Sequence, residues 1–109
     1  MSKTIAIVGA SADRSKYGNK AVRAFKQGGW TVYPVNPSVP EVEGLRTYAS
    51  IADIPGPIDR ISMYVPPKVG KAMLAAIAAK APQEFFLNPG SEDADLVREA
   101  EALGLHPIQ

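Results

Sequence analysis

The sequence predicts one α/β domain, a doubly wound parallel sheet of about five strands with helices on both faces. Three observations predict this class. Short apolar or β-branched runs alternate with segments of helical periodicity, which is the order found in parallel sheets with helical crossovers. The first run, residues 4–9, is continuously apolar after Thr4, as in a strand covered on both faces. At 109 residues the chain has room for one core, so residues 1–109 are interpreted as a single domain.

The strands follow from apolar and β-branched runs that are bounded by Gly and Pro. They are predicted at residues 4–9, 30–36, 60–65, 84–88 and 105–109, with a short edge strand at 45–48 and a loop at 37–44. Ser50 is expected to cap a single turn at 51–54. Pro34 conflicts with a central strand, because proline has no N–H for a ladder bond. We expect it at a strand end or a bulge.

Three helices are predicted from apolar spacing and from capping residues. The first starts at Gly18 or Asn19 and ends at Gln27, before a Gly-Gly pair. The second opens at Pro66-Pro67, and the third is capped by Ser91. The buried faces are predicted as Val69, Met73, Leu74 and Ile77 in the second helix and Leu96, Val97, Ala100 and Leu103 in the third.

Composition and charge exclude several functional classes. The net charge is +1, so nothing global indicates a nucleic-acid or membrane-surface partner. The chain has no cysteine, which excludes disulfides, thiolate metal sites and cysteine nucleophiles and fits a reducing compartment. No segment approaches the ~20 apolar residues of a membrane span, and Met1-Ser2-Lys3 leads into a strand without a signal-peptide pattern. We therefore expect a cytoplasmic protein.

The stretch from Gly9 to Gly18 is the strongest functional motif. A buried strand that ends at glycine and restarts as a helix directs backbone N–H groups and a positive helix end to one point, which favours phosphate. The dinucleotide pattern G-x-G-x-x-G is not matched, because Ala10 follows Gly9 and the next glycine is Gly18. The loop is longer, and we expect Arg14 and Lys16 to reach phosphate groups. The alternative is a tight turn with solvated basic residues.

Four strand ends are expected to meet at one crevice. In open α/β sheets, ligands bind beyond the carboxyl ends of the strands, where the strand order reverses. Each end is a weak signal alone, because Asn-Pro is also turn chemistry and Pro-Pro is also helix capping. Together they are more specific. The four ends are Gly9-Ala10-Ser11, Val35-Asn36-Pro37, Tyr64-Val65-Pro66-Pro67 and Asn88-Pro89-Gly90.

The sequence contains no recognisable catalytic or metal-binding constellation. His106 is the only histidine and has no evident nucleophile or acid partner, so we interpret it as a structural or surface residue. Ser11 lacks the nucleophile elbow G-x-S-x-G and a histidine base. The aspartates stand in capping or loop contexts without the spacing of a metal cage. The sequence therefore predicts binding rather than catalysis, with no catalytic residue and no metal.

Taken together, the motifs resemble those of the small stand-alone CoA-binding proteins. These are single Rossmann-like domains similar to the CoA-binding domain of the succinyl-CoA synthetase α subunit. The resemblance spans nearly the whole chain in the same order, and the set is more specific than any one motif. It rests on Ile7-Val8-Gly9-Ala10-Ser11, Lys16-Tyr17-Gly18-Asn19, Val32-Tyr33-Pro34-Val35-Asn36-Pro37, Ala52-Asp53-Ile54-Pro55, Tyr64-Val65-Pro66-Pro67 and Asn88-Pro89-Gly90.

The resemblance implies a Rossmann-like domain that binds coenzyme A or an acyl-CoA across its switch point without catalysing a reaction. The histidine that is phosphorylated in the synthetase lies on a separate domain, so ligase activity is not implied. Relatives usually continue with a Cys-containing segment, and the edge strand ending at Gln109 is expected to be incomplete. The implied residues are Gly9, Ala10, Ser11, Arg14, Lys16, Tyr17 and Gly18 around the phosphates, Asn36 and Pro37 on the nucleotide side, Tyr64, Val65, Pro66 and Pro67 beside the adenine and the start of the pantetheine arm, and Asn88, Pro89 and Gly90 at the far wall.

Two other functions stay open at the level of the sequence. In an NAD(P)-binding module or oxidoreductase remnant, Arg14 and Lys16 would serve a 2′-phosphate, and Asn36 stands where NAD enzymes usually place an acid. A single domain, however, offers no substrate half. The third hypothesis is an interaction protein whose shell has lost its ligand. Its partner would be a second copy in a homodimer, or an unidentified protein.

Overall fold

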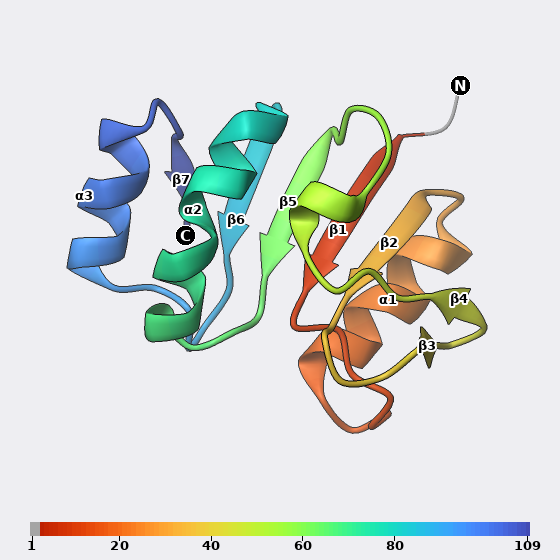
Figure 1. The fold of residues 1–109 in the computed structure, drawn as a ribbon. Coiled ribbons are helices and arrows are strands. Elements are labelled where there is room, and N and C mark those ends of the chain that lie inside the picture. The colour runs from red at the N-terminus through yellow and green to blue at the C-terminus, as the bar shows by residue number, and fades with distance from the viewer. Residues whose placement is uncertain (1–2) are drawn as a thin grey trace.

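The computed structural model describes residues 3–109 and contains a five-stranded sheet in the order β2-β1-β5-β6-β7 (Figure 1). Every neighbouring pair of these strands is parallel, which confirms the predicted α/β class. The five strands are β1 (Thr4–Val8), β2 (Thr31–Val35), β5 (Arg60–Met63), β6 (Glu84–Leu87) and β7 (Pro107–Ile108). The other elements are α1 (Tyr17–Gln27), α2 (Pro67–Lys80), α3 (Ala94–Ala102), the 3₁₀ turn η1 (Ile51–Asp53), and the hairpin of β3 (Glu41–Val42) and β4 (Leu45–Arg46).

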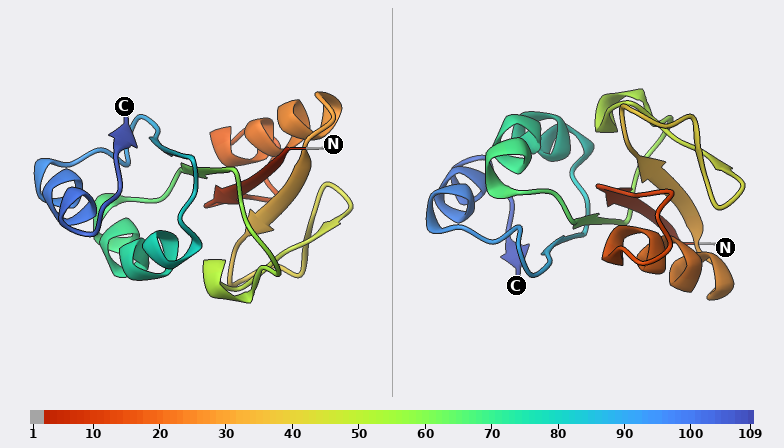
Figure 2. Two further views of the ribbon diagram at one scale, coloured as in Figure 1. Left: turned by 90° about the horizontal axis from the view of Figure 1, so that it is seen from above. Right: turned by 90° about the horizontal axis from the view of Figure 1, so that it is seen from below.

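Alternate residues of β1 point into two separate cores, one on each face of the sheet. Ile5 and Ile7 pack in a cluster with Val22 of α1. Ala6 and Val8 belong to the larger cluster, which includes residues of η1, α2 and α3. Figure 2 shows α1 on one face, with η1 and α2 on the other. Each large aliphatic side chain fully buried in these cores contributes about 1.5–3 kcal/mol to folding.

Pro34 is accommodated because β2 is the edge strand of the sheet. Pro34 stands in register with Ile7 of β1, and its carbonyl accepts the N–H of Tyr48 at 2.9 Å. The N–H of Asn36 donates to the Tyr48 carbonyl at 3.0 Å on the same outer side. Alternate residues of a parallel strand bond to opposite sides, so the missing N–H of Pro34 faces away from β1. The expectation of a strand end or a bulge is therefore corrected to an edge position.

Residues 37–44, predicted as loop, contain the strand β3. It pairs antiparallel with β4 across a two-residue turn, Glu43-Gly44, in which φ is 49° and 79°. Two positive φ values are typical of the type I′ turns that close such hairpins. Glutamate has no preference for this conformation, so the sequence carries no signal for the turn. The predicted edge strand 45–48 is half wrong: its first two residues pair with β3, and only Tyr48 bridges to the main sheet.

The second helix buries a different face from the predicted one at its first turn. Val69 is 49% exposed, whereas Gly70, Leu74 and Ile77 are buried. The reason is a close approach between helix and sheet: a Cβ added at Gly70 would lie 2.5 Å from the sulfur of Met63. The absence of a side chain at Gly70 leaves room for the Met63 and Leu96 side chains against this face of α2, and Val69 lies on the solvent side of the helix.

The third helix is capped by Asp93, not by Ser91 as predicted. The Asp93 carboxylate accepts the N–H of Leu96 at 3.1 Å, while Ser91 is buried and donates its hydroxyl to the Val65 carbonyl. Leu103 is the C-cap residue and is 48% exposed, so it is not part of the buried stripe. Ser50 precedes η1 as predicted, but its side chain makes no capping bond to a backbone N–H.

Candidate functional site

The strand order reverses between β1 and β5, and the loops that follow these two strands touch each other. The chain leaves β1 towards α1 on one face and leaves β5 towards α2 on the other (Figure 1). The N–H of Tyr64 donates to the Val8 carbonyl at 2.8 Å. Gly9 has φ 90°, and a Cβ there would lie 3.0 Å from Val65 and 3.1 Å from the Tyr64 backbone. Glycine is therefore required at the floor of this switch point.

The first turn of α1 lies directly against the end of β1. A Cβ added at Gly18 would lie 2.3 Å from the carbonyl oxygen of Gly9, closer than real Cβ atoms approach. The N-cap residue Lys16 makes no side-chain cap bond, and the first turn contains no acidic residue. Within residues 3–109, the N–H groups of Tyr17 and Gly18 have no hydrogen-bond partner. Free N–H groups and the positive helix end make this a preformed point for an anion.

Asn19 lines neither cavity of the cleft but connects the elements around it, and sequence reasoning did not single it out. It is fully buried, and its amide nitrogen donates to the Ser11 carbonyl at 2.8 Å and to the Glu43 carboxylate at 3.1 Å. Its amide oxygen accepts from the Arg23 Nε at 2.8 Å. These bonds hold the β1–α1 loop (residues 9–16) between the helix and the hairpin. The signal available in the sequence was an asparagine, a poor helix former, in a first helical turn.

Two adjoining cavities form a cleft at this edge of the sheet. The first has a volume of about 290 Å³, and the second, of about 310 Å³, shares three of its lining residues. The first is lined by Gly9, Lys16, Tyr17, Gly18, Tyr64 and Pro89, and the second by Tyr17, Tyr64, Asn88 and Pro89. Seven of the sixteen predicted site residues therefore lie together. The cleft thus extends from the N-terminus of α1, past the two tyrosines that line both cavities, to the residues that follow β6.

Eight other predicted residues follow the same strands without lining either cavity. Asn36, one of these eight, connects two strand ends, because its side-chain amide donates to the Ala10 carbonyl at 2.8 Å. Asn88 makes a similar bond to the Ser62 hydroxyl at 2.8 Å. Asn88 also lines the cleft, whereas Asn36 does not. The eight are Ala10, Ser11, Asn36, Pro37, Val65, Pro66, Pro67 and Gly90.

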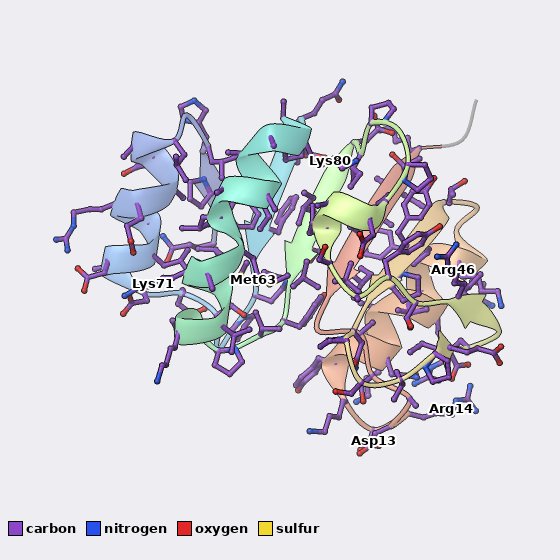
Figure 3. All side chains as sticks on the ribbon, viewed as in Figure 1. Asp13, Arg14, Arg46, Met63, Lys71 and Lys80 are labelled. Carbon is purple, nitrogen blue, oxygen red and sulfur yellow. The ribbon has the colours of Figure 1, made fainter. Side chains whose placement is uncertain are left out.

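Arg14 is placed apart from the other predicted phosphate-contacting residues. Its Nε lies 3.4 Å from the Glu43 carboxylate, and its side chain is 66% exposed. It lines a third cavity, of about 530 Å³, with Arg23, Lys26 and Gln27 of α1. In Figure 3, Arg14 lies below the β3–β4 hairpin, on the side of the loop away from α2. The structure therefore separates Arg14 from Lys16, although only one residue stands between them.

Asp13 orders the turn in the middle of the β1–α1 loop. Its carboxylate accepts from the hydroxyl of Ser15 at 2.6 Å and from the Ser15 N–H at 3.0 Å. These bonds hold the pKa of Asp13 below its usual range, because they favour the charged carboxylate. The N–H of Asp13 in turn donates to the Ser11 hydroxyl at 3.0 Å. The loop therefore has its own internal hydrogen bonds.

Other possible sites in the described part of the chain are less developed. Among residues 3–109, no group of three or more His, Asp or Glu side chains is arranged to hold a metal ion. No helix there is long and apolar enough to cross a membrane. His106 is exposed and lines a cavity of about 250 Å³ at the amino-terminal edge of the sheet, beside Phe85 and Leu103. This edge is opposite to the cleft.

Comparisons with known proteins give one family match over the described chain and ligase relatives that match about 70% of it. The model of the family described as "CoA binding domain" matches residues 3–109. Over 80 residues the chain is 38% identical to ADP-forming acetate–CoA ligase II of Archaeoglobus fulgidus, which covers 72% of this chain and 12% of the ligase. It is 41% identical over 78 residues to the α subunit of ADP-forming acetate–CoA ligase II of Pyrococcus furiosus, covering 70% of this chain and 17% of that subunit.

A solved structure resembles the fold over nearly its full length. It is a conserved hypothetical protein from Pyrococcus furiosus, with a TM-score of 0.87 and 34% sequence identity. The match covers 98% of this chain and 91% of that chain. The match thus spans less than a fifth of the length of either ligase chain, but most of the length of the hypothetical protein from Pyrococcus furiosus.

Proposed function

This chain belongs to the CoA-binding domain family, and from that premise we propose that it binds coenzyme A or an acyl-CoA at the β1–β5 cleft without catalysis. The observation that carries the proposal is the uncapped N-terminus of α1. The N–H groups of Tyr17 and Gly18 have no partner within residues 3–109, and Lys16 lines the same cavity. The diphosphate of the ligand would accept from these N–H groups and lie beside the Lys16 ammonium.

The shape of the site supports a diphosphate at this point. A Cβ on Gly18 would fill the space between helix and strand, so the bare backbone forms a cradle against Gly9. No carboxylate stands in the first turn of α1 to compete for the N–H groups. Anions at such a helix end are favoured by about 0.3–1 kcal/mol from the dipole alone, and each charge-assisted hydrogen bond adds to this.

The aromatic wall of the cleft fits the less polar part of such a ligand. Tyr17 and Tyr64 border both cavities, and Pro89 closes them on the side of β6. Aromatic and proline faces offer apolar area at low cost in conformational entropy. We infer that the pantetheine arm runs from the α1 N-terminus along this wall towards Asn88.

The residues that line the two cavities support binding rather than chemistry. None of these lining residues carries a carboxylate, an imidazole or an aliphatic hydroxyl. The groups in the cavities that could act as an acid, base or nucleophile are the Lys16 ammonium and the Tyr17 and Tyr64 hydroxyls, and no carboxylate or imidazole lines the cavities beside them to activate them. The ligases that share this domain are several times longer than this chain, so their activity is not transferred to it.

Isothermal titration of the purified protein with CoA, acetyl-CoA, NAD and NADP tests the proposal. We expect CoA and acetyl-CoA to bind and NAD to give no heat. Micromolar binding of NADP with no heat from CoA would overturn the proposal in favour of a nicotinamide dinucleotide.

The variant Lys16→Gln tests the position of the diphosphate. Loss of one charge-assisted contact should weaken CoA binding by roughly 1.5 kcal/mol, or about tenfold. The matched control is Arg98→Gln on α3, which removes one positive charge from a side chain that is 73% exposed. Equal affinities for the Lys16 variant and the control would remove Lys16 from the site.

A further inference from the structure

The cavity between α1 and the β3–β4 hairpin is a second basic site beside the same loop. It is lined by Arg14, Arg23, Lys26, Gln27 and Glu43, so three cations face one carboxylate. Arg23 donates from Nε to Asn19 and from Nη2 to the Arg14 carbonyl, which leaves three of its five N–H groups free. Lys26 donates one N–H to the Glu43 carbonyl at 2.8 Å and keeps two. The cavity therefore combines net positive charge with unpaired donors.

The position of this cavity relative to the cleft suits one ligand that reaches both. Lys16 lines the cleft and Arg14 lines the basic cavity, and their Cα atoms are at most about 7 Å apart, because only Ser15 stands between them. In doubly wound sheets the nucleotide half of a ligand extends over the end of the second strand. Here β2 leads into the hairpin, whose tip at Glu43 borders the basic cavity. The cavity is thus on the nucleotide side of the cleft.

Glu43 holds Arg14 only weakly, so Arg14 can turn to a stronger anion. The ion pair measures 3.4 Å, and the Arg14 side chain is two-thirds exposed. Exposed pairs of this kind contribute little to stability. A phosphate dianion forms shorter, charge-assisted and often bidentate bonds with arginine. Glu43 itself is kept in place by Asn19 and stays beside the phosphate as a repulsive charge.

We propose that this basic cavity binds the phosphate monoester on the ribose of the nucleotide, which in CoA is the 3′-phosphate. The inference rests on the proposed CoA binding and adds a second anion subsite, made by Arg14, Arg23 and Lys26. It assigns Arg14 to the ribose phosphate instead of the diphosphate. It also makes Glu43 a residue that tunes selectivity for the phosphorylated ribose.

The experiment compares the affinities of CoA and 3′-dephospho-CoA in matched variants by isothermal titration. The wild type should bind CoA on the order of tenfold more tightly, since the 3′-phosphate adds charge-assisted contacts. Arg14→Gln and Lys26→Gln should each reduce this ratio by severalfold and leave the affinity for dephospho-CoA unchanged. Glu43→Gln, whose amide oxygen can still accept from Asn19, should increase the ratio. Opposite signs at neighbouring side chains are hard to obtain from a general loss of folding.

The control variant is Arg46→Gln in the same hairpin. Arg46 lies 4.8 Å from the Tyr48 ring and outside the basic cavity (Figure 3), so its loss changes the net charge but should not change the ratio. Thermal melting checks that every variant is folded.

Each outcome of this titration decides one of the two proposals. Equal binding of CoA and dephospho-CoA to the wild type would overturn this inference and leave the proposed function standing. An unchanged ratio in both Arg14→Gln and Lys26→Gln would do the same. No binding of either ligand would overturn the proposed function itself. A preference for NADP over NAD in that case would identify a 2′-phosphate as the source and reject the CoA assignment.

Discussion

Replacing Gly18 with alanine should both destabilise the protein and weaken its ligand site. The new Cβ would lie 2.3 Å from the Gly9 carbonyl oxygen, with the Gly9 carbon at 3.1 Å and the Ala10 Cα at 3.4 Å. All three atoms belong to the backbone, so no side chain can rotate away. Contacts under 3.0 Å are essentially never made by real Cβ atoms, so α1 and β1 must separate by at least about 0.7 Å.

The expected change in the free energy of unfolding has the opposite sign to that of an ordinary glycine-to-alanine substitution in a helix. Alanine usually stabilises a helix by about 1 kcal/mol, through propensity and through the entropy of the unfolded chain. Overpacking against a backbone costs about 2–3 kcal/mol. The net loss in free energy of unfolding should be about 1–2 kcal/mol, which lowers Tm by roughly 5–10 °C in a domain of this size. A displacement of this size would also lengthen and misalign the hydrogen bonds that the Tyr17 and Gly18 N–H groups donate to the ligand. CoA affinity should therefore fall at least about tenfold.

Urea denaturation and isothermal titration measure the two effects, and Gly28→Ala is the control. Gly28 lies at the other end of α1 with φ −79°, and its nearest neighbour to an added Cβ is the Ala24 carbonyl at 3.4 Å. Its replacement should change stability by less than about 0.5 kcal/mol. A Gly18→Ala protein as stable as the wild type, with unchanged ligand affinity, would refute the close-packing argument.

Two further predictions concern buried and charged hydrogen bonds. Asn19→Leu should lower the free energy of unfolding, measured by urea denaturation, by about 2–3 kcal/mol, because Arg23 and the Ser11 carbonyl lose their buried partner. A decrease of less than about 0.5 kcal/mol would show that water replaces the amide. The Leu96 N–H, and then Lys71, hold the pKa of Asp93 below its usual range. A lowered folded pKa contributes stability that is complete above about pH 4 and is lost as the pH falls through the folded pKa. Asp93→Asn should therefore flatten the acid limb of a stability profile, and an unchanged limb would contradict this.

The fold was largely predictable because each signal was local. The apolar run of β1, the glycine pair after Gln27 and the prolines at the start of α2 all specify their elements by backbone chemistry alone. The errors arose where distant contacts decide. Val69 faces solvent because Gly70 packs against Met63, and the hairpin turn at Glu43 is stabilised by contacts to α1 that sequence spacing does not show.

The candidate site was predictable in its location but not in its division of roles. The strand ends could be assigned to one edge, since parallel strands bring their carboxyl ends together. Which side chains line the cleft depends on the side of the β1–α1 loop from which they project. Lys16 projects on the side of the cleft, and Arg14 projects on the side of the basic cavity. The role of Asn19 could not be predicted from the sequence, because its burial between helix, loop and hairpin follows from the tertiary fold.

Three asparagine amides around the switch point affect the thermodynamics of ligand binding. Asn19, Asn36 and Asn88 fasten the loops around the switch point through bonds made within the protein. The entropy of ordering these loops is therefore lost during folding and not when the ligand arrives, which favours tight binding by a small site. Ligand affinity then depends on the fraction of molecules in which the asparagine hydrogen bonds hold these loops in place. A substitution that opens them locally raises the apparent Kd in proportion to the lost population, even when it touches no ligand atom.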